Sequence, residues 1–141
     1  MIFVDTSAWA AISLSKDRYH KAATRFQTKL RRSREELLTS NFIMYETLTL
    51  LLSQAGYLQA IRFYNILQVM IAAGVLRLHH VTGETEEEAW QIFRRFNVDK
   101  EWSFTDCTSK AIMEATRTTE VFTFDHHFDQ MGFLCVPGPT E

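Results

Sequence analysis

Short apolar runs alternate with longer segments of helical periodicity along this chain. The apolar runs are rich in β-branched, aromatic and leucine side chains and predict strands at residues 2–4, 37–39, 75–81, 121–124 and 133–136. Between them, apolar residues recur at spacings of three and four, which predicts helices from about residue 8 and over 19–30, 42–54, 57–73, 85–96 and 104–115. This alternation favours βαβ units, so we expect an α/β fold, a three-layer α/β/α sandwich with a central, mostly parallel sheet.

Capping residues predict where several of these helices begin and end. Thr6 or Ser7 suits the N-cap of the first helix, because a hydroxyl accepts a hydrogen bond from the free N–H groups of the first turn. Thr85 and the acidic run after it match a capping box for a later helix. Gly56 predicts the end of the helix over 42–54.

The consecutive helices over 42–54 and 57–73 carry more apolar side chains than one sheet face plausibly covers. The side chains concerned are Leu48, Leu51, Leu52, Leu58, Ile61, Phe63, Ile66, Leu67, Met70 and Ile71. Packing in the core explains them, and so does an interface between two copies of the chain. The sequence leaves both explanations open.

Length and hydropathy predict one domain without a membrane anchor. The 141 residues suit a single core over residues 1–141, and no repeat or linker interrupts them. The longest apolar stretch, residues 66–76, is shorter than the roughly 20 residues of a membrane span. No basic region precedes the first apolar run, as it would in a signal peptide, so we expect a cytoplasmic protein.

The charge balance limits how this protein could hold nucleic acid. A net charge of −2 argues against binding through bulk positive charge. The densest basic cluster includes Arg31, Arg32 and Arg34, which form either a solvated helix end or a rim that contacts RNA phosphates. The two cysteines are too few for a disulfide framework or a zinc ribbon, and we interpret them as buried thiols.

Two aspartates come directly after predicted strands. Asp5 follows the first strand and Asp125 follows the fourth, so both should emerge at the carboxyl edge of one parallel sheet, where ligands bind in open α/β folds. If the strands are neighbours, the two carboxylates approach each other. Their repulsion in a partly desolvated cleft is costly unless a cation or a proton intervenes.

Two further acids are candidates for the same place. Glu46 lies on a helical stripe with mostly apolar neighbours, where an unpaired carboxylate needs a metal or a buried partner. Asp106 begins a helix and points toward the same edge. Its alternative explanation is a capping role with Ser103 and a salt bridge to Lys110 one turn ahead.

Together these acids predict a pocket of oxygen ligands. Hard oxygen ligands favour Mg²⁺ or Mn²⁺ over zinc, and such ions bind substrate phosphates. Metal-assisted hydrolysis of a phosphodiester is therefore the chemistry that the residues favour, with one ion activating water and a second, about 4 Å away, stabilising the leaving oxygen.

The motifs around these acids resemble those of the PIN-domain ribonucleases, especially the VapC-type toxins of bacterial toxin–antitoxin pairs. The matching segments are Val4-Asp5-Thr6-Ser7, Tyr45-Glu46-Thr47, Phe104-Thr105-Asp106 and Phe122-Thr123-Phe124-Asp125-His126-His127-Phe128. The resemblance implies an acidic quartet that binds Mg²⁺ or Mn²⁺, formed by Asp5, Glu46, Asp106 and Asp125, with supporting hydroxyls from Thr6, Ser7 and Thr105. It also implies an endoribonuclease, a homodimer and an antitoxin that blocks the acidic cleft.

Other interpretations stay open. Asp125, His126 and His127 also spell the signature of another phosphoesterase family, whose further aspartate motifs this sequence lacks. The two histidines form either a polar turn or, as we expect for His126, a contact to RNA. A receiver-like acidic pocket, a protein-binding module and a PIN nuclease of RNA processing are alternatives to the function that we favour, a metal-dependent endoribonuclease toxin.

Overall fold

The computed structural model describes residues 1–138 and has a five-stranded, fully parallel sheet at its centre. The strand order is β3-β2-β1-β4-β5. The strands are β1 (Ile2–Val4), β2 (Leu37–Ser40), β3 (Leu76–His79), β4 (Glu120–Phe122) and β5 (Leu134–Val136). All three residues of β1 are buried, as expected for the middle strand of a sheet that is covered on both faces.

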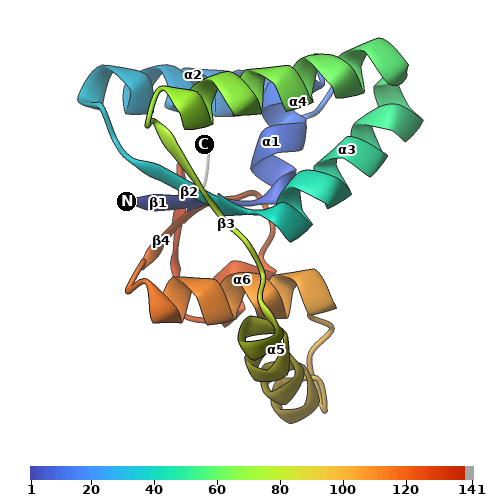
Figure 1. The fold of residues 1–141 in the computed structure, drawn as a ribbon, viewed down its shortest axis with the longest axis vertical. Helices are drawn as coiled ribbons and strands as arrows, with labels where there is room; N and C mark the ends of the chain where they lie inside the picture. Colours follow the sequence, from blue (N-terminus) through green and yellow to red (C-terminus); the bar gives the residue numbers. More distant parts are fainter. Residues whose placement is uncertain (139–141) are drawn as a thin grey trace.

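Helices cover both faces of this sheet (Figure 1). One layer contains α1 (Thr6–Ser13), α2 (His20–Ser33), α3 (Asn41–Ala55) and α4 (Tyr57–Ala72). The other contains α5 (Gly83–Phe96) and α6 (Phe104–Ala115), while the short α7 (His127–Gln130) precedes β5. The predicted three-layer α/β/α sandwich is therefore confirmed, and α7 is an element that the apolar pattern did not predict.

The cap assignments are partly wrong. Asp5, and neither Thr6 nor Ser7, is the N-cap of α1, because the helix starts immediately after the strand and the Asp5 carboxylate accepts from the Ser7 N–H. In the same way α5 begins two residues earlier than expected, so that Thr82 is its N-cap and its side chain accepts from the Thr85 N–H. Gly56 does end α3, in a backbone conformation with φ of 92° that favours glycine.

The apolar side chains of α3 and α4 divide between the core and the surface. Leu51, Phe63 and Leu67 are buried in the main core. Leu58 and Val69, in contrast, are more than two-thirds exposed. Core packing therefore explains only part of this apolar surface. No described helix is long and apolar enough to cross a membrane.

Candidate functional site

The centre of the candidate site is Asp5, at the carboxyl end of β1. The Ser7 and Thr123 hydroxyls each donate a hydrogen bond of 2.9 Å to its Oδ2 atom. The residue is only 4% exposed. Burial, reinforced by the nearby charge of Asp106, raises the pKa of the Asp5 carboxyl to about 6. The protein thus holds a carboxylate where a negative charge is costly.

Asp106 reaches the same edge from the first turn of α6. It forms a capping box with Ser103, in which each backbone N–H donates to the side chain of the other residue. Burial raises the pKa of the Asp106 carboxyl, and the hydrogen bond from His127 opposes that shift. The capping part of the alternative explanation for Asp106 is therefore confirmed, but the salt bridge to Lys110 is not formed, because Lys110 pairs with Glu114, one turn further along α6.

Asp125 lies in the loop between β4 and α7, three residues beyond the end of the strand. Its backbone N–H donates to the Thr123 hydroxyl over 3.0 Å, which links it to the group that supports Asp5. Its Oδ1 atom accepts from the His127 N–H over 2.9 Å. The loop thereby places Asp125 beside Asp5, which agrees with the pairing of β4 and β1.

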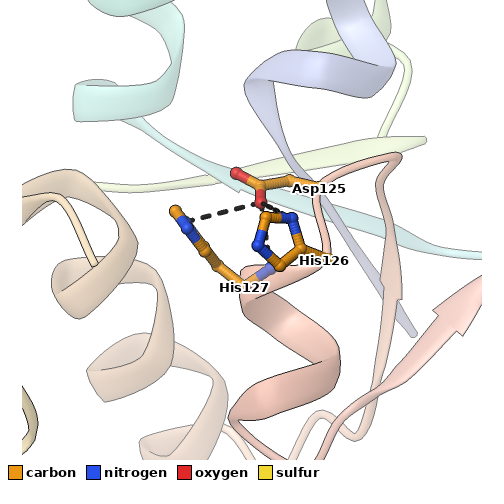
Figure 2. Close-up of side chains that lie close together, drawn as sticks. All are labelled: Asp125, His126 and His127. Atoms are coloured by element: carbon orange, nitrogen blue, oxygen red, sulfur yellow. Dashed lines mark hydrogen bonds and ion pairs between the residues drawn. The ribbon is translucent and has the colours of Figure 1, made fainter. Parts of the chain in front are cut away.

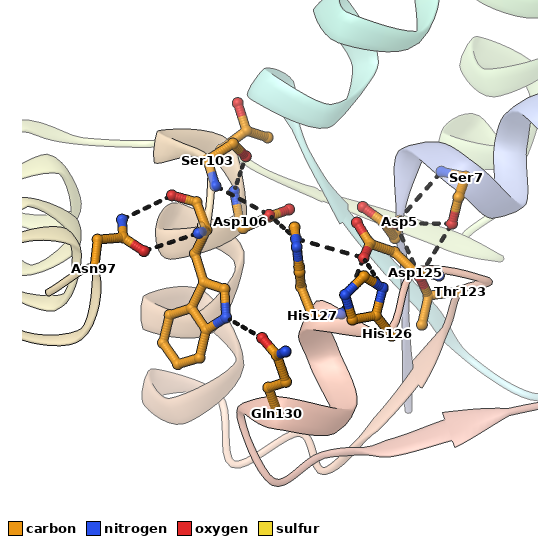
Figure 3. Close-up of polar contacts among 12 residues, drawn as sticks. Asp5, Ser7, Asn97, Ser103, Asp106, Thr123, Asp125, His126, His127 and Gln130 are labelled. Carbon is orange, nitrogen blue, oxygen red and sulfur yellow. Dashed lines mark hydrogen bonds and ion pairs between the residues drawn. The ribbon is translucent and has the colours of Figure 1, made fainter. Parts of the chain in front are cut away.

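His127 connects two of the acids (Figure 3), and Figure 2 shows its contact to one of them, Asp125. Its Nδ1 atom lies 3.0 Å from Asp106 Oδ2 and 3.4 Å from Asp125 Oδ1. The neighbouring His126 is 78% exposed, and its Nδ1 atom is 3.8 Å from Asp125 Oδ1. Among the described residues, no lysine or arginine forms an ion pair with Asp5, Asp106 or Asp125.

The chemistry of this cluster fits a divalent cation. Three carboxyl groups lie at one edge of the sheet, where burial raises the pKa of Asp5 and of Asp106, the charge of Asp106 adds to the first shift and the charge of Asp125 adds to the second. The hydrogen bonds described above use one oxygen of each carboxylate, so the other oxygen of each is available to a ligand. Hard oxygen donors of this kind suit Mg²⁺ or Mn²⁺.

Glu46 lies apart from these three acids. It was expected on a buried apolar stripe, but it is exposed, because α3 packs through Ile43, Thr47 and Leu51 and this face points away from Glu46. Its side chain lines a shallow cavity between α3 and α6 together with Thr105, the residue before Asp106. Glu46 therefore lies beside the first turn of α6, on the rim of a cavity that none of the three aspartates lines.

The predicted hydroxyls have different surroundings, and two contributors were missed. Ser7 supports Asp5, whereas the buried Thr6 hydroxyl has no hydrogen-bond partner among the described residues. Thr123 and His127 were not assigned to the site from sequence. Thr123 could have been assigned to the site from sequence, because it directly follows a buried strand that ends beside Asp5. His127 could not be recognised in this way, since its contact to Asp106 joins residues 21 positions apart.

The arginines predicted to contact RNA lie at the other edge of the sheet. Arg31 and Arg32 are in the last turn of α2 and Arg34 is its C-cap, just before the start of β2. Glu36, which follows them, accepts a hydrogen bond from Ile2 at the start of β1. The arginines are therefore at the amino edge, whereas the acids are at the carboxyl edge. Their role in RNA binding stays a prediction.

Comparisons with known proteins agree with this geometry. The family model of the PIN domain matches residues 2–134. The proteins named "23S rRNA-specific endonuclease VapC20" from two Mycobacterium tuberculosis strains, CDC 1551 and H37Rv, are each 36% identical over 134 residues, which cover 95% of this chain and 96% of theirs. The crystal structure of M. tuberculosis VapC20, described as a sarcin-ricin loop cleaving toxin, superposes with a TM-score of 0.81 at 35% identity, covering 95% of this chain and 97% of that one. This chain therefore belongs to the PIN-domain family, in its VapC-type branch.

Proposed function

We propose that this protein is a VapC-type toxin that hydrolyses RNA phosphodiester bonds with the help of Mg²⁺ or Mn²⁺. The observation that carries the proposal is the meeting of Asp5, Asp106 and Asp125 in a mostly buried cluster with no lysine or arginine paired to it among the described residues. Like charges that are held together in this way favour a bound cation. Membership of a family of toxin nucleases supports the same conclusion.

In this proposal the three aspartates hold the metal and Glu46 contributes from the rim, across the cavity that it shares with Thr105. The ion, when bound, supplies activation of water and stabilisation of negative charge on the phosphate. The chain itself fixes the donors. Ser7 and Thr123 orient Asp5, and the Ser103 N–H and His127 orient Asp106.

The substrate class and the partner follow from the relatives. They are named for 23S rRNA and for the sarcin-ricin loop, so we propose a ribosomal RNA hairpin as the target of this chain. We also propose a cognate antitoxin that covers the acidic cleft. Growth arrest on expression, relieved by the antitoxin, would separate a toxin from a PIN nuclease of RNA processing, whose expression would leave growth unchanged.

The direct test is cleavage of an RNA hairpin with the sarcin-ricin sequence. We expect cleavage with Mn²⁺ or Mg²⁺, none with EDTA, and a rate at least about 100-fold lower in Asp106→Asn, because this change weakens the hold on the metal. Asp99→Asn, at an exposed aspartate that pairs with Lys100 and makes no hydrogen bond to the three acids among the described residues, is the matched control and should cleave normally. Full activity in EDTA or in Asp106→Asn would overturn the proposal.

We further propose a homodimer formed through α3 and α4. These helices expose apolar side chains at Leu52, Leu58 and Val69. Exposed apolar groups that gather on adjacent helices favour association. In sedimentation velocity, Leu58→Glu should shift the protein to monomer, whereas Val98→Glu, in the exposed segment after α5, should not. A wild-type monomer at all concentrations would contradict the dimer.

A further inference from the structure

His127 is held more firmly than a residue of a polar turn needs to be. Its backbone N–H donates to Asp125 Oδ1, and the next side chain, Phe128, is fully buried in the main core. The imidazole ring is only 22% exposed and lies between α6 and the loop after β4. The ring therefore has a defined position between Asp106 and Asp125 (Figure 3).

The distances around the ring match those between neighbouring ligands of one ion. In an octahedral site with metal–ligand bonds of about 2.1 Å, adjacent donor atoms are about 3.0 Å apart. The Nδ1 atom of His127 lies 3.0 Å from Asp106 Oδ2 and 3.4 Å from Asp125 Oδ1. The ring nitrogen is thus within about the separation of adjacent ligands from both carboxyl groups.

The neighbouring histidine is less suited to this role. Ligand atoms of Asp125, His126 and His127 all lie within 4.8 Å of one another, so both rings are near enough to be considered. His126, however, is largely exposed and makes no hydrogen bond to any of the three acids among the described residues. The buried side of the cluster therefore contains one nitrogen donor, from His127.

We propose that His127 is a nitrogen ligand of the divalent ion and that it shifts the preference of the site toward Mn²⁺ and away from Mg²⁺. This inference rests on the proposed metal dependence of the enzyme. Imidazole binds transition metals well, whereas Mg²⁺ prefers oxygen ligands and keeps its waters. Ligation requires Nδ1 without a proton, so when the ion binds, the hydrogen bond from Nδ1 to Asp106 is given up and its proton moves to Nε2 or to solvent.

The test is pulsed electron paramagnetic resonance of the full chain loaded with Mn²⁺, together with Mn²⁺ and Mg²⁺ affinities from calorimetry. Wild type should show modulation from an imidazole ¹⁴N nucleus, and His127→Asn should lose it. His127→Asn should also bind Mn²⁺ roughly tenfold or more weakly, with a smaller loss for Mg²⁺. His126→Asn and His80→Asn, a matched change at an exposed histidine, should retain the signal.

The other outcomes separate the competing roles. Bound Mn²⁺ without ¹⁴N modulation, and equal losses for both ions in His127→Asn, would mean that His127 only positions Asp106 and would overturn the proposal. Tighter binding of both ions in His127→Asn would mean that the ring competes with the metal, which also overturns it. Wild-type protein that binds neither ion would instead contradict the proposed metal dependence itself. The melting temperature of each metal-free variant checks that it folds.

Discussion

At the scale of the residue, the ionised carboxylate of Asp5 is unfavourable for the metal-free fold. Its pKa rises from 3.8 to about 6 on folding, so between these values the folded chain binds a proton that the unfolded chain has lost. The stability of the metal-free protein must therefore fall as the pH rises through this window. A bound cation would remove this penalty, and so would a neutral side chain.

Asp5→Asn tests this penalty directly. Asparagine still caps a helix and still accepts hydrogen bonds from Ser7 and Thr123, but it carries no charge. In EDTA at pH 7.5 we expect the free energy of unfolding to rise by up to about 3 kcal/mol relative to wild type, and most of this gain to be lost at pH 4. Urea unfolding at both pH values measures the difference. A gain that is independent of pH would contradict the assignment.

The same carboxyl group predicts how metal binding depends on pH. Because the Asp5 pKa is about 6, an ion that binds this carboxyl at pH 5 must displace a proton, whereas at pH 7 the Asp5 carboxyl is mostly ionised. The affinity for Mn²⁺ should therefore increase by roughly tenfold from pH 5 to pH 7 and level off above pH 7. Calorimetric titrations across this range provide the measurement. A constant affinity would show that Asp5 does not bind the ion.

At the scale of the element, the start of α6 combines a structural role with a chemical one. Ser103 accepts the Asp106 N–H through its hydroxyl, while the Asp106 carboxylate accepts the backbone N–H of Ser103. Ser103→Ala removes only the first of these bonds. We expect it to lower the free energy of unfolding by about 1 kcal/mol, and the affinity for Mn²⁺ to stay within roughly twofold. A large loss of affinity would mean that the cap hydroxyl controls the metal site.

Elements were more predictable from sequence than the contacts between them. The apolar runs located all five strands within a few residues, because burial on both faces leaves a continuous apolar pattern. Glu46 was misjudged because a helix with apolar residues on several sides does not reveal which side meets the core. His127 was missed because its partner Asp106 belongs to another element, and no local pattern encodes such a contact.

At the scale of the whole molecule, the parallel sheet separates positive from negative charge. The acids lie at the carboxyl edge, and Arg31, Arg32 and Arg34 lie where α2 leads into β2 at the amino edge. The order of helix and strand could have predicted this separation, since a helix that leads into a parallel strand ends at the amino edge. RNA that contacts both groups must therefore extend around the protein.

The salt dependence of RNA binding tests whether bound RNA contacts the arginines at the amino edge. In the triple variant Arg31→Ala, Arg32→Ala, Arg34→Ala, fewer phosphates would be neutralised. We expect a flatter dependence of affinity on salt for long RNA, and an unchanged dependence for a short hairpin that occupies only the acidic edge. Filter binding at several salt concentrations measures both slopes. If the slope for long RNA is unchanged, these arginines do not contact RNA.

The central claim is that acids from distant parts of the chain meet in order to hold a divalent ion. A crystal grown with Mn²⁺ and measured at the manganese absorption edge tests it most directly. We expect an anomalous peak within about 2.2 Å of carboxylate oxygens of Asp5, Asp106 and Asp125. An ordered cluster without such a peak at saturating Mn²⁺, or a peak bound elsewhere on the protein, would contradict it.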